Sequence, residues 1–393
     1  MKLYNNKNEI TNYFYNFFKN FSDSKNLLKF LAPMFCSLIN SESVTFSKIA
    51  TKLFEDFNSD VKIDSHIRRI SRFLNNSRYY IHSITDNIIR YSLSNFRLSH
   101  KDNNVHVSFD HMYSKEKFTI LMFTLRIGKQ GVPICFKCFY GRRLNENHGD
   151  AFKIIEVILG IKYCHDLIKN VIPDSNIIFL ADRWFGNLFP LMNFIDTLGD
   201  KFVMRCKSNM KVFYKPNKEN HKVWMNISDL PHYIHHSSIY YNLEFTKYKY
   251  VYNLVYSKSN NHKEPWLLIT NYDPRKAKAF YGYRFGSIEF LFKSQKSNGF
   301  YLEKTGIKSL HAFDNLYSLV CLACFYLTVL GTEISTHFSS YKNIGITIVK
   351  TNPLTKKKYR CISRFRAGLY LFHMAYNSTK RFKLSFNFRL YDA

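Results

Sequence analysis

Two aspartates in this chain follow strand-like runs and could bind a divalent cation together. Asp110 ends the alternating run 105–110, and Asp182 ends the apolar run 176–182. In an open α/β sheet the ligand crevice lies beyond the carboxyl ends of the strands, so we expect the two side chains to meet there. Carboxylate oxygens are the hard ligands that Mg²⁺ and Mn²⁺ prefer. The alternative is that both aspartates are turn or cap residues.

A third acid is expected from a later helix, and Glu289 is the best candidate. It lies in the stretch 281–296, whose apolar residues recur on one face. Glu289 and Lys296 are seven residues apart, about two helical turns, so they point the same way along the helix. The alternative is an exposed glutamate that pairs with Lys293 at i+4.

Three carboxylates in one place suit the cleavage of a phosphodiester. That reaction needs a strong nucleophile at neutral pH and neutralisation of charge at both apical oxygens, and two metal ions about 3.5–4 Å apart supply both. Asp110, Asp182 and Glu289 would offset most of the charge of two such ions, so no Ser-His-Asp or Cys-His set is needed. We expect two Mg²⁺ ions, or Mn²⁺, with Arg284 and Lys296 holding phosphates.

The charge of the chain points to a polyanionic partner. Lys and Arg number 57 against 29 Asp and Glu, which gives a formal net charge of +28. Nucleic acid is the first expectation and an anionic membrane surface the second. The alternative is compositional drift in an AT-rich genome. With 46% hydrophobic and 22% charged residues, the composition excludes wholesale disorder.

Other features favour a protein of a reducing cytoplasm without a membrane partner. The longest apolar run, 316–331, is shorter than the roughly 18 residues of a spanning helix, so we expect a buried core helix. Eight cysteines are too few for a disulfide scaffold. Cys135 and Cys138 lie on an expected strand and Cys321 and Cys324 on an expected helix, which favours buried thiols over a zinc site.

Residues 1–98 have the near-3.6 apolar period of helices. In the segment 64–74 the basic residues Arg68, Arg69 and Arg72 fall off the apolar face. Two short helices with a basic second member could form a helix-turn-helix that binds DNA. The alternative is a solvated basic face on a packing helix.

The middle of the chain predicts a mixed sheet with helices on its faces. Residues 207–275 interrupt this pattern, and their recurring strand-like pieces predict a β-rich insertion. Trp224 and Trp266 fall in it, and a strand core is a better prediction for them than stacking on a base. The expected order is β-β-β-α-β-α-β, with strands at 105–110, 117–127, 132–140, 176–182 and 201–206 and helices at 150–165 and 187–198.

These residues, in this order, resemble the DDE transposases of the bacterial insertion-sequence-four family, which carry a Tyr-Arg-Glu-Lys signature. The resemblance covers roughly residues 40–370, including an Arg-Arg-x-x-Arg-Phe-Leu stretch near residue 70 and 363–369. The matching motifs are Asp110, Ala181-Asp182-Arg183 with Phe185-Gly186, and Tyr283-Arg284 followed by Glu289 and Lys296.

One signature position departs from the family pattern. With Glu289 as the Glu, we assign Tyr283 to the Tyr position and Lys296 to the Lys position. Gly286 is then assigned to the Arg position, and Arg284, two residues earlier, is offered as a substitute. By the resemblance, Tyr283 also contacts a phosphate near the cut.

The resemblance implies a ribonuclease-H-like α/β fold with flanking helices and a β-rich insertion between the second Asp and the Glu. It implies a homodimer that cuts double-stranded DNA at transposon ends and joins the freed 3′-OH to target DNA, in the bacterial cytoplasm and on the nucleoid when bound. The alternatives are an inactive transposase-derived DNA-binding protein and another nuclease of the same fold. The expected parts are a helical DNA-binding domain (1–98), the catalytic domain (99–206 and 276–335), the insertion (207–275) and a C-terminal region (336–393).

Overall fold

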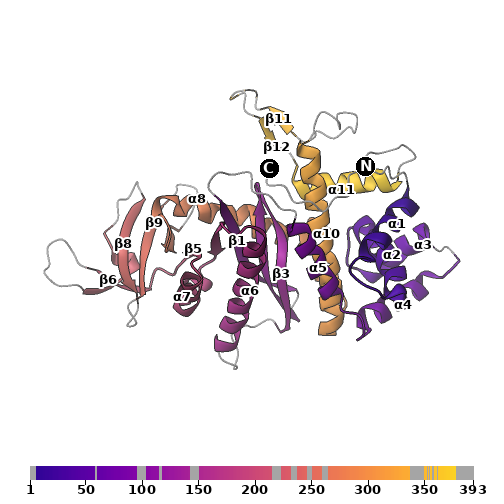
Figure 1. Cartoon of the computed structure of the whole chain (residues 1–393), viewed down its shortest axis with the longest axis horizontal. Coiled ribbons are helices and arrows are strands. Elements are labelled where there is room, and N and C mark those ends of the chain that lie inside the picture. The colour runs from indigo at the N-terminus through magenta and orange to yellow at the C-terminus, as the bar shows by residue number, and fades with distance from the viewer. Residues whose placement is uncertain are drawn as a thin grey trace.

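The computed structural model has a group of helices at one end, a long sheet across the other, and a buried helix between them (Figure 1). It describes residues 6–57, 60–94, 103–114, 117–141, 150–214, 223–231, 237–245, 250–258, 264–336, 349–351, 353, 355, 358–360 and 362–377.

The helices expected before residue 98 are present. They bury apolar stripes against one another, and in α4 Ile70, Phe73 and Leu74 face the core. An aromatic cluster ties the first two helices together, because Phe14 packs edge-on against Phe35 with ring centroids 4.9 Å apart. The five helices are α1 (Lys7–Phe18), α2 (Lys25–Ser41), α3 (Phe46–Asp56), α4 (Ile63–Asn75) and α5 (Ile81–Leu93).

The expected strands of the middle segment form one side of a mixed sheet. β1 (Asn104–Ser114), β2 (Phe118–Ile127) and β3 (Gln130–Tyr140) are antiparallel neighbours. A two-residue turn joins β2 to β3, with Gly128 at φ 57°, a conformation that favours glycine.

The second half of this sheet is parallel. β4 (Asn176–Ala181) pairs with β1, and β5 (Lys201–Arg205) pairs with β4, both in parallel. Helical connections make this possible, since a parallel neighbour needs a crossover. The connecting elements are α6 (Asp150–Val171), η1 (Phe185–Asn187) and α7 (Phe189–Thr197).

The strands of the insertion continue the same sheet. β10 pairs antiparallel with β5, where Leu268 faces Arg205, so within the described residues ten strands form one sheet in the order β3-β2-β1-β4-β5-β10-β9-β8-β6-β7. Trp266 packs on Tyr281, whereas Trp224 is 47% exposed on the outermost strand. The added elements are β6 (Lys211–Tyr214), β7 (Val223–Asn226), η2 (Ile227–Asp229), β8 (Ser238–Phe245), β9 (Tyr250–Ser257) and β10 (Trp266–Thr270).

A long helical run follows the sheet. α8 (Pro274–Arg284) passes into the π-helical turn η3 (Phe285–Glu289) and then α9 (Phe290–Lys296) without a break. Asp273 caps the start, where its side chain accepts the backbone N–H of Arg275. The remaining elements are η4 (Leu302–Lys304), α10 (Leu310–Thr336), the hairpin of β11 (Val349–Thr351) and β12 (Lys358–Arg360), and α11 (Arg364–Asn377).

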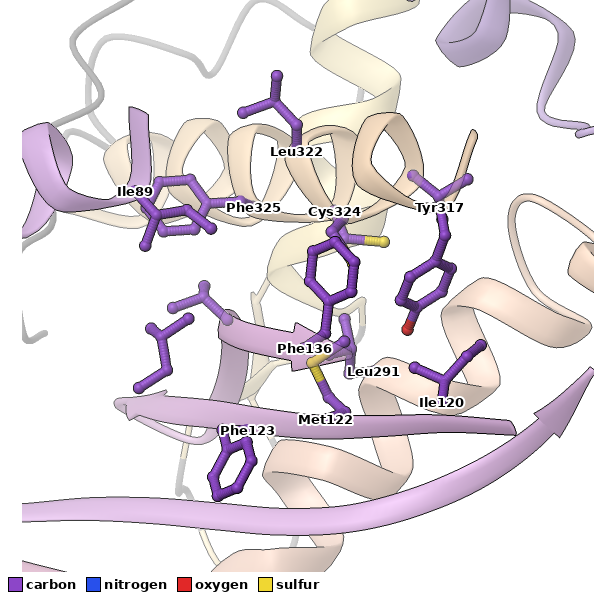
Figure 2. Packing of buried hydrophobic residues seen from close by; sticks show 14 of the residues in the cluster. Ile89, Ile120, Met122, Phe123, Phe136, Leu291, Tyr317, Leu322, Cys324 and Phe325 are labelled. Carbon is purple, nitrogen blue, oxygen red and sulfur yellow. The ribbon is translucent and has the colours of Figure 1, made fainter. Parts of the chain in front are cut away.

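α10 is the core helix that the apolar run predicts. By length and composition alone Leu310–Thr332 could cross a membrane, but 94% of its most apolar window is buried inside the fold. Figure 2 shows Tyr317 and Cys324 on the side of α10 that faces Phe136 of β3. The helix therefore fills the space between the sheet and the N-terminal helices (Figure 1).

α10 and α11 touch backbone to backbone at two glycines. A Cβ on Gly331 would lie 1.8 Å from the carbonyl oxygen of Arg364, and one on Gly368 would lie 1.9 Å from that of Leu327. We expect Gly368→Ala to lower the free energy of unfolding by about 3 kcal/mol, because the helices must separate. Gly282→Ala is the control, since a Cβ there meets nothing within 4 Å.

That control should raise the free energy of unfolding by about 0.5–1 kcal/mol, as alanine does in an open helical position. Urea unfolding of both variants measures the difference. Similar effects of the two substitutions would contradict the close crossing of α10 and α11.

Candidate active site

Asp110 and Asp182 lie at the same level along the neighbouring strands β1 and β4. The parallel pairing of β1 with β4 ends at Ser108 opposite Leu180, and each aspartate follows two residues later. Their meeting is therefore a consequence of register, as expected for the carboxyl ends of parallel strands. One detail of the sequence interpretation is wrong: β1 does not end at Asp110 but continues to Ser114, paired with β2 alone.

The turn after β4 fixes the carboxylate of Asp182. Its Oδ1 accepts the backbone N–H of Trp184 at 2.9 Å. The turn packs directly under β5, because a Cβ on Gly186 would lie 1.8 Å from the carbonyl oxygen of Arg205. Asp182 is thus a turn-capping residue, which is the alternative role that the sequence analysis names. The turn holds its carboxylate beside Asp110.

Glu289 and Arg284 reach this place from the helical run. One guanidinium nitrogen of Arg284, Nη1, lies 2.8 Å from Oε1 of Glu289 and 3.5 Å from Oδ2 of Asp110. Arg284 therefore binds both acids at once, and only 8% of its side chain is exposed. The structure brings together Asp110, Asp182, Glu289 and Arg284, which the sequence separates by up to 179 positions.

The π-helical turn η3 makes this arrangement possible. Residues five apart in an α-helix lie about 140° apart around the axis. In a π-helical turn the hydrogen bonds run from i to i+5, so residues five apart lie on the same side of the helix. Arg284 can therefore reach Glu289. η3 packs on the sheet through a 2.7 Å hydrogen bond between the hydroxyls of Ser287 and Ser108 and through Gly286, where a Cβ would lie 2.4 Å from the carbonyl oxygen of Lys129.

The electrostatics reflect an excess of buried negative charge. Burial, and then the charge of Asp182, raise the pKa of Asp110 from 3.8 to about 7, although Arg284 opposes this. Burial alone would lower the pKa of Arg284, but the charges of Asp110, Tyr281 and Glu289 outweigh it and raise that pKa. The acids therefore favour any cation that can reach them.

His111 is a site residue that the sequence interpretation missed. Its Nδ1 lies 3.8 Å from Oδ1 of Asp110, and its ring stands edge-on to Trp184 with centroids 5.2 Å apart. Burial lowers the pKa of His111, and the charge of Asp182 opposes the shift. The signal that could have found it is its position next to Asp110.

The chemistry of the donors fits a divalent cation. Asp110, Asp182 and Glu289 offer carboxylate oxygens, the ligands of Mg²⁺ and Mn²⁺. Within the described ranges, no three His, Cys, Asp or Glu side chains already lie close enough to form a ligand set. Arg284 lies between Asp110 and Glu289 and supplies the positive charge.

Other basic residues lie next to carboxylates outside the cluster of Asp110, Asp182 and Glu289. Glu264 lies 3.2 Å from Arg183 and 3.0 Å from Arg205, next to the turn of Asp182. Lys296 lies 3.2 Å from Glu303. These cations are partly exposed, so an anion can replace the acidic partner.

Tyr283 does not join the acids. The guanidinium of Arg126 lies over its ring, 3.4 Å from the centroid, and its ring also meets that of His106 at 5.0 Å. Tyr281, which the sequence interpretation did not select, lies instead beside Arg284, whose guanidinium is 5.8 Å from its ring centroid.

The basic residues of α4 lie outside this site. Arg68, Arg69 and Arg72 are exposed and off the buried face, as predicted. The guanidinium of Arg69 lies 4.5 Å from the ring centroid of Phe30 on α2. α4 belongs to the helical end of the molecule, far from β5 in Figure 1.

A cavity of about 650 Å³ lies elsewhere, between α5, β3, α6 and α10. Its polar lining includes His82, Asp86 and Asp314. None of the acids around Arg284 lines it, so it is separate from the candidate active site.

The fold and this cluster define an α/β protein with a mixed ten-stranded sheet and an acidic site at the end of its central parallel strands. No protein-family model matches the sequence, and no curated protein matches it.

Proposed function

We propose that the protein is a DDE transposase, a metal-dependent enzyme that cuts DNA at transposon ends and transfers the freed strand to target DNA. The observation that carries the proposal is the convergence of Asp110, Asp182 and Glu289, from three distant segments, around one buried cation, Arg284. An acidic site of this kind in a protein of charge +28 suits phosphodiester chemistry on nucleic acid.

The topology supports a ribonuclease-H-like fold. Three antiparallel strands, β1 to β3, are followed by β4 and β5 in parallel, with helices in the connections. This is the mixed sheet with flanking helices that the resemblance implies. The strands of the insertion lie between the second Asp and the Glu in the chain, also as the resemblance implies.

The π-helical turn also improves the match to the Tyr-Arg-Glu-Lys signature. The family has three residues between Arg and Glu, so its Arg falls on Phe285 here, not on Gly286, and Arg284 is one residue early. One extra residue is what a π-helical turn accommodates. Two residues then separate Tyr281 from Arg284, as in the family, so we infer that Tyr281 rather than Tyr283 is the signature Tyr.

The residues of the site would have two roles, metal binding and phosphate binding. Asp110, Asp182 and Glu289 would hold the metal ions, which supply an activated nucleophile and stabilise the leaving oxygen. Arg284 can bind a phosphate with its planar fork once its acidic partners hold a cation, and Lys296 can bind one as a point charge.

The active form is proposed as a homodimer on double-stranded DNA. The exposed Arg68, Arg69 and Arg72 on α4 offer phosphate contacts outside the active site. α3 and α4 pack on each other, which agrees with the helix pair expected for DNA binding.

Arg183 and Arg205 provide a test of DNA binding beside the acids. Glu264 holds both, so we expect Glu264→Gln to tighten DNA binding several-fold at low salt by freeing two phosphate-binding side chains. Asp174→Asn makes the same charge change at an exposed residue before β4, at the opposite end of that strand. Fluorescence anisotropy over a range of salt concentrations measures both.

The effect of Glu264→Gln should shrink as salt rises, because counterions compete for the freed arginines. If Asp174→Asn tightened binding equally, the effect would be one of net charge and not of this site.

The test of the proposed function is cleavage and joining of labelled DNA that carries the genomic flanks of the gene, incubated with the purified protein and Mg²⁺. Nicks at the flanks and joined products on a denaturing gel are expected. Binding without nicking would support the inactive DNA-binding protein, and cutting without joining would support another nuclease of this fold. A protein that neither binds nor cuts this DNA would contradict the proposal.

A further inference from the structure

We propose that His111 is a nitrogen ligand of the metal centre, beside Asp110 and Asp182, and that it makes the centre favour Mn²⁺ over Mg²⁺. This inference rests on the proposed function, because it adds a ligand to the metal site that the three acids would form. It concerns a residue outside the DDE motif and outside the Tyr-Arg-Glu-Lys signature.

Nδ1 of His111 is buried and has no hydrogen-bond partner among the described residues. Buried polar atoms of side chains are nearly always paired, and an exception beside a functional site is commonly explained by an ion or a water molecule. Oδ1 of Asp110 lies 3.8 Å from Nδ1.

The distance between Nδ1 of His111 and Oδ1 of Asp110 is close to that between two ligands of one ion. Ligand atoms about 2.1–2.2 Å from one ion, at right angles to each other, lie about 3 Å apart. The separation of 3.8 Å between Nδ1 of His111 and Oδ1 of Asp110 is within one ångström of that value. Binding one ion would need the two atoms to move closer by less than one ångström.

The imidazole ring of His111 is already held in place. It stands edge-on to Trp184, Tyr113 and Phe185, with centroids 5.2, 5.5 and 5.9 Å away. Trp184 also donates its backbone N–H to Asp182, so one turn positions both the carboxylate and the imidazole. Metal ligands are commonly oriented by such supporting contacts.

The chemical consequence is a change in metal preference. A site of carboxylates alone suits Mg²⁺, which takes oxygen ligands at near-ideal octahedral geometry. Imidazole is a ligand of first-row transition metals, and among these Mn²⁺ also accepts carboxylates. His111 should therefore favour Mn²⁺ at this site.

The test is pulsed electron paramagnetic resonance of Mn²⁺ bound to the full-length protein without DNA. We expect modulation from a directly coordinated ¹⁴N nucleus, replaced by the ¹⁵N pattern when the protein carries ¹⁵N-histidine. This readout needs no substitution, so it does not depend on a variant that folds. His111→Phe, which keeps an aromatic ring against Trp184, should remove the modulation.

Titration calorimetry supplies the second readout. His111→Phe should weaken Mn²⁺ binding by roughly tenfold or more and change Mg²⁺ binding by less than about threefold. His82→Phe is the matched control, because His82 pairs with Asp314 in the separate cavity. It should leave both the modulation and the Mn²⁺ affinity unchanged.

Failure of this inference differs from failure of the proposed function. If Mn²⁺ binds, Asp182→Asn abolishes the binding and histidine modulation is absent, the role of His111 is overturned while the metal centre stands. If Mn²⁺ does not bind the wild-type protein, or binds Asp182→Asn equally well, the metal centre itself is contradicted.

Discussion

Asp182→Asn is expected to lower DNA cleavage by at least about 1,000-fold while DNA binding changes little. Removing one carboxylate from the proposed metal centre should cost several kcal/mol of transition-state stabilisation, and about 4 kcal/mol corresponds to 1,000-fold. The asparagine oxygen can still accept the backbone N–H of Trp184, so the turn after β4 should persist. Single-turnover cleavage of labelled DNA and anisotropy binding measure the two effects.

Asp174→Asn is the matched control for this prediction. It lies before β4, at the other end of the strand from Asp182, and is exposed. It should cut at the wild-type rate. Cleavage by Asp182→Asn at the wild-type rate would show that the assignment of this metal ligand is wrong.

Much of the core sheet was predictable because its strands carry local signals. Strands such as 176–182 are continuous apolar runs bounded by turn residues, and the chain order then limits the topology. The placement of Asp110 beside Asp182 followed from that order. The continuation of β1 beyond Asp110 did not, because it depends on pairing with β2, which a single strand does not encode.

The attachment of the insertion to the core sheet was not predictable for a similar reason. β10 joins β5 through pairs such as Leu268 with Arg205, which are 63 residues apart in the chain. Register of this kind is decided by tertiary packing and not by local composition. The sequence therefore predicts the strands of 207–275 but not their continuity with the core.

The π-helical turn is the feature of the site that sequence patterns could not predict. Its residues have no composition that distinguishes them from α-helix, and the turn is held by contacts with distant segments, at Ser108 of β1 and at Lys129 in the turn between β2 and β3. Without it, Arg284 is out of register with Glu289, and Tyr283 is selected in place of Tyr281. The proposed assignment of the signature residues thus depends on tertiary structure.

Metal-free Asp110→Asn should be more stable than the metal-free wild type at pH 8. The pKa of Asp110 is about 7 in the folded protein and about 3.9 in an unfolded chain. Between pH 4 and pH 7 the carboxyl of Asp110 is protonated in the folded state but ionised in the unfolded state. The contribution of this group to the free energy of unfolding therefore falls as pH rises through this range. The asparagine side chain of the variant does not titrate, so the variant does not lose stability in this way.

We expect the gain of Asp110→Asn to be about 2–4 kcal/mol at pH 8 and close to zero near pH 4. Arg284 keeps its partner Glu289, 2.8 Å away, so no buried charge is left unpaired. Urea unfolding in the presence of EDTA across this pH range measures the difference. A gain that is the same at all pH values would contradict the raised pKa of Asp110.

If Asp110 is a metal ligand, metal ions should make the wild type more stable than Asp110→Asn. Binding to the folded state stabilises the wild type by about 2.7 kcal/mol at a free Mn²⁺ concentration of 100 times the dissociation constant. Asp110→Asn lacks this ligand and should gain little from Mn²⁺. A buried carboxylate that destabilises the metal-free fold is then retained for metal binding, since functional sites commonly oppose stability. If Mn²⁺ stabilised both proteins equally, Asp110 would be excluded as a ligand although its effect on the metal-free protein remained.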